Sequence, residues 1–149
     1  MTWEEVVLLR LHEAGHAVVG HVLGARVVGA TLEGVEFGLG FDGEPLAVAA
    51  LAGGVAARLF GPRWRSPNRG ASDSDLATAA SALGVDRLDP FARARLERAA
   101  EGILFDHERT VRAVAGALGR VDRLNAHQVA RLASGSSVDA VVGPSFNFA

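Results

Sequence analysis

At residues 2–24 the chain reads TWEEVVLLRLHEAGHAVVGHVLG. Thr2 and Glu5 stand in the T-x-x-E relation of a capping box, which places Trp3 at the first helical position. Apolar residues then recur at the three- and four-residue spacings of a helix, and Gly24 is a natural residue to follow a helix C-terminus. We therefore predict one helix of about six turns across this stretch.

The middle of this helix contains the pattern H-E-x-x-H at residues 12–16. On a helix, His12 and His16 are separated by about 40° of arc and one turn of rise, so both imidazoles can reach one ion. Zinc bound there would lower the pKa of a water molecule and polarise a scissile carbonyl. Glu13 is about 60° round the helix from His16, which suits the general base that takes the proton and passes it to the leaving amine.

A simpler interpretation is a pair of surface histidines beside a solvated glutamate. The neighbouring residues argue against it, because Ala14, Gly15 and Ala17 are small and the stretch is otherwise apolar. Small neighbours leave room for an ion and for the approach of another backbone.

The rest of the chain is divided by glycine and proline into shorter elements. We predict strands at Val27–Leu32 and Val35–Phe41, and helices at Pro45–Phe60, from Ser72–Ser74 to Gly84, from Asp89 to near Gly119, and a short one capped by Asn125 and Gln128. Gly53-Gly54 indicates close packing of another backbone on the second helix. Residues 62–71 are expected to form a loop, and residues 134–149 an irregular tail. The prediction is a mainly α (α+β) fold in one domain, residues 1–149, with a small β element after the first helix.

Composition excludes several kinds of site. The chain has no cysteine, so disulfides and thiolate metal sites are impossible and a metal must use His, Asp or Glu. A net charge of −2 does not favour nucleic acid, and Arg63, Trp64, Arg65 and Arg69 in the predicted loop are better explained as a solvated loop. No signal peptide is evident, and the longest uncharged apolar stretch falls short of the ~20 residues of a spanning helix. We expect a soluble, cytoplasmic protein.

Two histidines do not complete a catalytic zinc site, which usually has three protein ligands and a water. His21 lies about 140° from His16 on the same helix and cannot join the pair. His107 and His127 belong to other predicted helices in polar surroundings. The better candidates are Asp73 and Asp75 in the stretch GASDSDL at residues 70–76.

Three of these stretches resemble one known family. HEAGHAVVG at residues 12–20, LAGGVAARLFG at 51–61 and GASDSDL at 70–76 are similar to motifs in the peptidase domain of the FtsH-type AAA+ zinc metalloproteases. ILFDHERTV at 103–111, followed by a short helix, is similar to the end of that domain. The resemblance covers most of residues 9–133 and implies a zincin-like peptidase domain.

The third zinc ligand of this family is an aspartate in a Gly-Ala-Ser-x-Asp-Leu context. Counted from the leucine, that role falls on Asp75; counted from Gly-Ala-Ser, it is one residue off and Asp73 becomes the candidate. We assign Asp75. A capping box formed by Ser72 and Asp75 would explain both residues without a metal.

The resemblance implies a zinc-dependent metallopeptidase that cleaves flexible or unfolded polypeptide. The strand Val35–Phe41 would be its substrate-binding edge, with Gly38, Leu39 and Gly40 as substrate contacts. We expect no ATPase domain and no membrane anchor of the kind that the family has, and Arg58 stands where the family commonly has a glutamate. Expected partners are a polypeptide substrate, an ATPase or unfoldase in trans and a second copy in a homo-oligomer, with no nucleic acid and no membrane. The alternative is a non-catalytic zinc-containing binding or adaptor module, but such a module has no need of Glu13.

Overall fold

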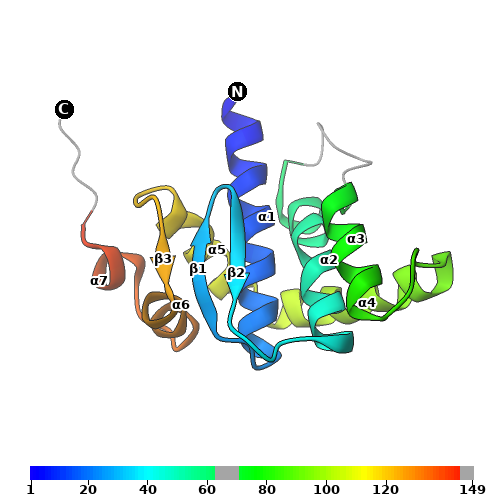
Figure 1. The fold of residues 1–149 in the computed structure, drawn as a ribbon. Helices are drawn as coiled ribbons and strands as arrows, with labels where there is room; N and C mark the ends of the chain where they lie inside the picture. The colour runs from blue at the N-terminus through cyan, green and yellow to red at the C-terminus, as the bar shows by residue number, and fades with distance from the viewer. Residues whose placement is uncertain (63–70, 145–149) are drawn as a thin grey trace.

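The computed structural model describes residues 1–62 and 71–144 of the chain (Figure 1). Its first helix, α1, spans Trp3–Val22 and begins at the predicted capping box. The Thr2 side chain accepts a hydrogen bond from the Glu5 backbone, and the Glu5 carboxylate accepts one from the Thr2 backbone. The helix ends at Val22 with Leu23 as its C-cap, and the next residue, Gly24, has a φ of +98°, the left-handed conformation that glycine adopts most easily. Both ends of α1 were thus predicted from the sequence.

Helix α2, Gly43–Phe60, packs along α1 and forms the centre of the molecule. The two backbones approach closely at Gly15, where a Cβ atom would lie only 2.6 Å from Cβ of Ala56 and 2.7 Å from the carbonyl oxygen of Ala52. Every residue of α2 from Ala47 to Ala57 is buried. By length and composition α2 is also the one described helix that could cross a membrane, although most of it is buried inside the protein, as in an ordinary core helix.

A three-stranded antiparallel sheet lies beside α1, with strand order β2-β1-β3. Its strands are β1, Val27–Thr31; β2, Gly34–Phe37; and β3, Leu124–Asn125. The β1–β2 hairpin follows α1 directly, as Figure 1 shows, and β2 is at the edge of the sheet. The prediction that this strand runs to Phe41 was wrong, because the ladder ends where Val27 pairs with Phe37.

The remaining large helices are α3, Asp73–Ala82; α4, Pro90–Asp106; and α5, Glu108–Leu118. We predicted α4 and α5 as one helix, and this was wrong. His107, with φ −122° and ψ 24°, leaves the helical conformation and separates them. The physical reason is tertiary packing: α4 packs on α2, whereas α5 packs on α1, and one straight helix could not follow both.

Two short helices end the described chain. Helix α6, Ala126–Ala133, begins at the predicted capping box of Asn125 and Gln128. Helix α7, Val138–Val142, corrects the prediction of a wholly irregular tail, since Ser137 caps it by accepting from the Ala140 backbone. The arginine- and tryptophan-containing loop predicted at 62–71 lies mostly outside the described residues, as do residues 145–149. The fold is therefore mainly helical with a small antiparallel sheet, as predicted.

Candidate metal centre

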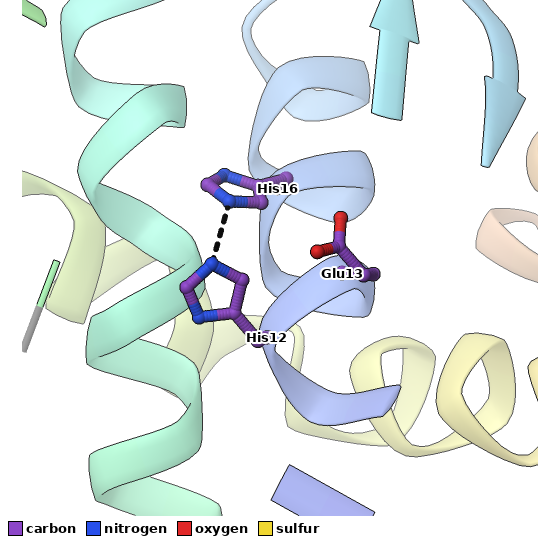
Figure 2. A group of neighbouring side chains, drawn as sticks. All are labelled: His12, Glu13 and His16. Atoms are coloured by element: carbon purple, nitrogen blue, oxygen red, sulfur yellow. Dashed lines mark hydrogen bonds between the residues drawn. The ribbon is translucent and has the colours of Figure 1, made fainter. Parts of the chain in front are cut away.

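The two histidines of the H-E-x-x-H pattern lie side by side on α1 (Figure 2). The Nε2 atoms of His12 and His16 are 3.0 Å apart, and the two rings meet edge to face at a centroid distance of 4.7 Å. This is the outcome expected from a separation of one helical turn. Both imidazoles are directed into the same space, beside the Glu13 carboxylate.

Helix α3 brings Asp75 to the same point. One carboxylate oxygen of Asp75 lies 3.0 Å from Nε2 of His12, and the other lies 3.4 Å from Nε2 of His16. Ser72 caps α3 by accepting from the Asp75 backbone, but no reciprocal bond from the Asp75 side chain is present. The capping box that could have explained Asp75 without a metal is therefore not formed, and its carboxylate faces the histidines instead.

The spacing of these three side chains fits a tetrahedral ion. Ligand atoms about 2.0–2.1 Å from a tetrahedral zinc ion are about 3.3 Å from one another. The two Nε2 atoms are 3.0 Å apart, close to that edge length, and each has a different oxygen of Asp75 beside it, at 3.0 Å from His12 and 3.4 Å from His16. One oxygen of Asp75 is buried and has no hydrogen-bond partner, although buried polar atoms are normally satisfied. Among the described residues, the metal-capable group is His12, Glu13 and His16, whose ligand atoms all lie within 4.8 Å of one another. The Asp75 carboxylate lies next to the two histidines of this group.

A backbone carbonyl of α2 fixes the orientation of the His16 ring. Its Nδ1 atom is 2.8 Å from the backbone carbonyl oxygen of Ala49 in α2. A carbonyl oxygen can only accept, so Nδ1 carries the hydrogen and donates it. The lone pair of the neutral imidazole is then on Nε2, the atom that faces His12 and Asp75. Metal-binding histidines are usually oriented by such a contact, and nothing in the sequence pattern pointed to Ala49.

Gly53 of α2 forms the wall behind the two imidazoles. A Cβ atom at this position would lie 2.5 Å from Nε2 of His16 and 2.8 Å from Nε2 of His12. We predicted that the Gly53-Gly54 pair marks close packing. The close neighbours of Gly53 are the imidazoles of α1. Because glycine has no side chain, the Nε2 atoms of both histidines can occupy the space beside it.

Glu13 is buried beside this group. Glu13 and His16 are the only buried polar or charged residues in the part of the chain that the structure describes, with 6% and 8% of their surface exposed. Burial raises the pKa of the Glu13 carboxyl, and this effect outweighs the positive charges of His16 and His12, which act to lower it. One of its oxygens has no hydrogen-bond partner. A carboxylate with a raised pKa is a stronger base than an ordinary surface glutamate.

Asp75 and His16 shift each other's titration in the metal-free protein. Burial by itself would raise the pKa of Asp75, but the imidazoles of His12 and His16 close to its carboxylate favour the charged form and hold the pKa well below its usual range. Burial opposes protonation of His16, yet the hydrogen bond and charge of Asp75, with the Ala49 carbonyl, outweigh it and raise the pKa of this imidazole. In the metal-free protein the charged forms of Asp75 and His16 therefore stabilise each other.

The group opens into a cleft of about 350 Å³. Its walls come from α1, α2, α3 and the edge strand β2, which contributes Gly34, Val35 and Phe37. A second hollow of about 470 Å³ continues past His12 and Glu13 toward the N-terminal part of α1 and is mainly apolar. His12 and Glu13 therefore line both hollows, whereas His16 lines only the first.

Other candidates from the sequence are not part of this group. Asp73 is exposed at the start of α3, and His21, His107 and His127 are absent from the metal-capable group of the described residues. Gly38, Leu39 and Gly40 do not line the cleft; Leu39 is fully exposed, and the Gly38 N–H donates to the carbonyl of Arg26. Arg58 lies 3.8 Å from Glu101 of α4 in a partly exposed ion pair, away from the imidazoles.

Comparison of the chain with protein-family models, with curated proteins and with solved structures finds no match. The geometry of the site itself must therefore support any functional assignment.

Proposed function

We propose that the protein is a zinc-dependent metallopeptidase-like hydrolase that cleaves flexible or unfolded polypeptide. His12 and His16 would hold the ion through Nε2, and Asp75 would complete the ligand set through its carboxylate. When bound, zinc supplies Lewis acidity, which lowers the pKa of a water molecule and polarises a carbonyl. Asp75 is better placed than Glu13 to be the third ligand, because its oxygens approach both Nε2 atoms to 3.0 and 3.4 Å.

The observation that carries the proposal is the state of Glu13. A purely structural metal site has no need of a buried carboxylate that is not a ligand, and burying such a group is costly. Here Glu13 is buried, has a raised pKa and keeps one oxygen unpartnered beside the histidines. In the proposed reaction Glu13 takes a proton from the attacking water as the water oxygen bonds to the peptide carbon. It then delivers that proton to the nitrogen of the leaving amine as the C–N bond breaks.

The edge strand suggests how a substrate would bind. Gly34, Val35 and Phe37 of β2 line the cleft beside the metal group. Because β2 is at the edge of the sheet, an extended peptide could pair with it and lie across the cleft. This assigns substrate contacts to residues 34–37 in place of Gly38, Leu39 and Gly40. A segment held in the substrate's own secondary structure could not pair in this way, so the substrates would be flexible or unfolded.

The experiment that tests the proposal is the variant Glu13→Gln. It keeps the shape of the side chain but removes the base, so zinc content should stay unchanged while turnover of casein falls by about 10²–10⁴-fold. Glu101→Gln is the matched control, because Glu101 is on α4, pairs with Arg58 and does not line the cleft. If the zinc-loaded wild type cleaves no unfolded substrate, the protein is a zinc-containing binding module and the proposed activity is wrong.

A further inference from the structure

A third hollow, of about 220 Å³, lies between α1, the end of α2 and α5. Arg10 and His12 are about 160° apart on the helix, so this hollow is on the opposite side of α1 from the metal centre. Its floor is apolar, formed by Val7, Leu11 and Ala115, and Phe60 forms a wall. Two arginines, Arg10 and Arg112, also line it.

Arg10 lacks an anionic partner among the described residues. Its Nε atom is buried without any hydrogen-bond partner, and no ion pair of the described chain includes it. Its guanidinium stacks near the Trp3 ring, 5.5 Å from the ring centroid, and lies close to Gly119, where a Cβ would be 3.0 Å from Cζ. A buried N–H group without an acceptor is costly. Among the described residues, no carboxylate neutralises the positive charge of Arg10 at the hollow.

Arg112 supplies the second positive charge at the hollow, and its guanidinium is held by Glu108 and Phe60. Its Nε donates to Glu108 at 2.8 Å, one turn earlier on α5, and its guanidinium lies 5.3 Å from the ring centroid of Phe60. With Glu108 counted, the two arginines leave one net positive charge at the hollow. A planar guanidinium suits a carboxylate, since it can donate two parallel hydrogen bonds. The apolar floor suits a hydrocarbon group attached to that carboxylate.

We propose that this hollow binds the C-terminal carboxylate of a polypeptide whose last side chain is apolar. At about 220 Å³ the hollow is smaller than the roughly 300–1,000 Å³ of usual small-molecule pockets, so it has room for one terminal residue. The preceding residues of the ligand would cover Trp3 and Phe105, which are 68% and 56% exposed and each lie beside a residue that lines the hollow. Trp3 contacts Arg10, and the Phe105 ring is 6.2 Å from that of Phe60. This site is independent of the metal centre and of its proposed activity.

The first test compares ligands that differ only in the carboxylate. Isotope-labelled protein is titrated with N-acetyl-leucine, with N-acetyl-leucinamide, and with a short peptide ending in leucine as the free acid or the amide. Backbone amide resonances of Val7–Leu11 and Ala115–Gly116 should shift saturably with the acids, and each acid should bind at least about tenfold more tightly than its amide. Equal binding of acid and amide would refute the proposal. If the peptide acid binds no more tightly than N-acetyl-leucine, the occupant is a small carboxylic acid and not a polypeptide end.

The second test uses variants. Arg10→Met should weaken binding of the peptide acid by about tenfold or more. Arg10→Lys keeps the positive charge but not the planar guanidinium, so it should lose part of the affinity. Arg95→Met is the matched control, because Arg95 is exposed, pairs with Glu44 and does not line the hollow. The shifts should persist in His12→Ala, which separates this site from a carboxylate bound at the metal centre. If Arg10→Met lowers stability but leaves the acid-over-amide preference intact in a folded protein, Arg10 only braces α5 and the proposal is wrong.

Discussion

Gly53 of α2 faces His16 of α1 so closely that a Cβ atom on the glycine would lie 2.5 Å from Nε2 of the imidazole. Gly53→Ala should therefore displace the ligand atoms and weaken zinc binding by about 10–100-fold, the usual range for disturbing the groups behind metal ligands. Zinc affinity is measured by competition with a chromogenic chelator. His16 is buried and its ring is held by the Ala49 carbonyl, so this imidazole cannot move away without losing that hydrogen bond.

Gly102→Ala is the matched control for this substitution. Gly102 is also inside a helix, and a Cβ there would meet nothing within 4 Å. It should leave zinc affinity unchanged and raise the free energy of unfolding by about 0.5–1 kcal/mol, because alanine loses less backbone entropy than glycine. Equal zinc affinity of Gly53→Ala and wild type would show that the imidazoles do not converge on α2 as described.

Removing either histidine should remove the metal. We expect about one zinc per chain in the wild type and loss of most of it in His12→Ala and in His16→Ala, measured by elemental analysis. His21→Ala is the control, since His21 is on the same helix but outside the metal-capable group. If both site variants retain zinc as tightly as the wild type does, the ion is bound elsewhere.

The two aspartates of α3 should differ sharply. Asp75→Ala should weaken zinc binding substantially, because its carboxylate contacts both imidazoles. Asp73→Ala should keep most of the affinity, since this side chain is exposed at the first turn of the same helix. Titration of both variants with zinc measures the difference. The reverse order of affinities would transfer the ligand role to Asp73.

The metal-free protein should be less stable at pH 8 than at pH 6. Because folding lowers the pKa of Asp75, this residue stabilises the folded protein at pH values above its unfolded pKa of about 3.9. That stabilisation is lost as the pH falls through the folded pKa. Because folding raises the pKa of His16, this residue stabilises the folded protein at pH values below its unfolded pKa of about 6.5. That stabilisation is lost as the pH rises through the folded pKa. The raised pKa of Glu13 acts in the same direction as that of His16. The contribution of the Asp75–His16 pair is therefore largest between about pH 4 and 6.5.

Urea unfolding of the chelator-treated protein at the two pH values measures this effect. Asp75→Asn removes the negative charge that raises the pKa of His16, so its stability should depend less on pH between 6 and 8. Greater stability of the metal-free wild type at pH 8 would contradict the assigned shifts.

The sequence predicted those parts of the site that depend on local geometry. The spacing of His12 and His16 requires only one helical turn, and the helix was marked by its capping box and by Gly24. The proximity of Asp75 to both histidines was expected only from the family resemblance, because the two helices are far apart in the chain. Nothing in residues 72–76 themselves indicates where α3 packs.

The remaining errors come from tertiary packing. No glycine or proline marks the break at His107, which follows from α4 and α5 packing on different helices. Strand β3 is two residues long and exists by pairing with β1, so it has no pattern of its own. The carbonyl of Ala49 was also unpredictable, because every residue has one and only the crossing of α1 and α2 selects it.

Helix α3 buries only Ala79 and Ala80, and it packs mainly on α2 at the side of the molecule. An ion held by His12, His16 and Asp75 would cross-link this helix to α1 across a long stretch of chain, much as a disulfide closes a loop. Without that cross-link, local opening of α3 should cost little free energy and its amide hydrogens should exchange first. Ser74, Asp75 and Thr78 form one wall of the cleft. Chelation would thus free that wall to move, and a protein without its metal would lose the shape of its binding cleft.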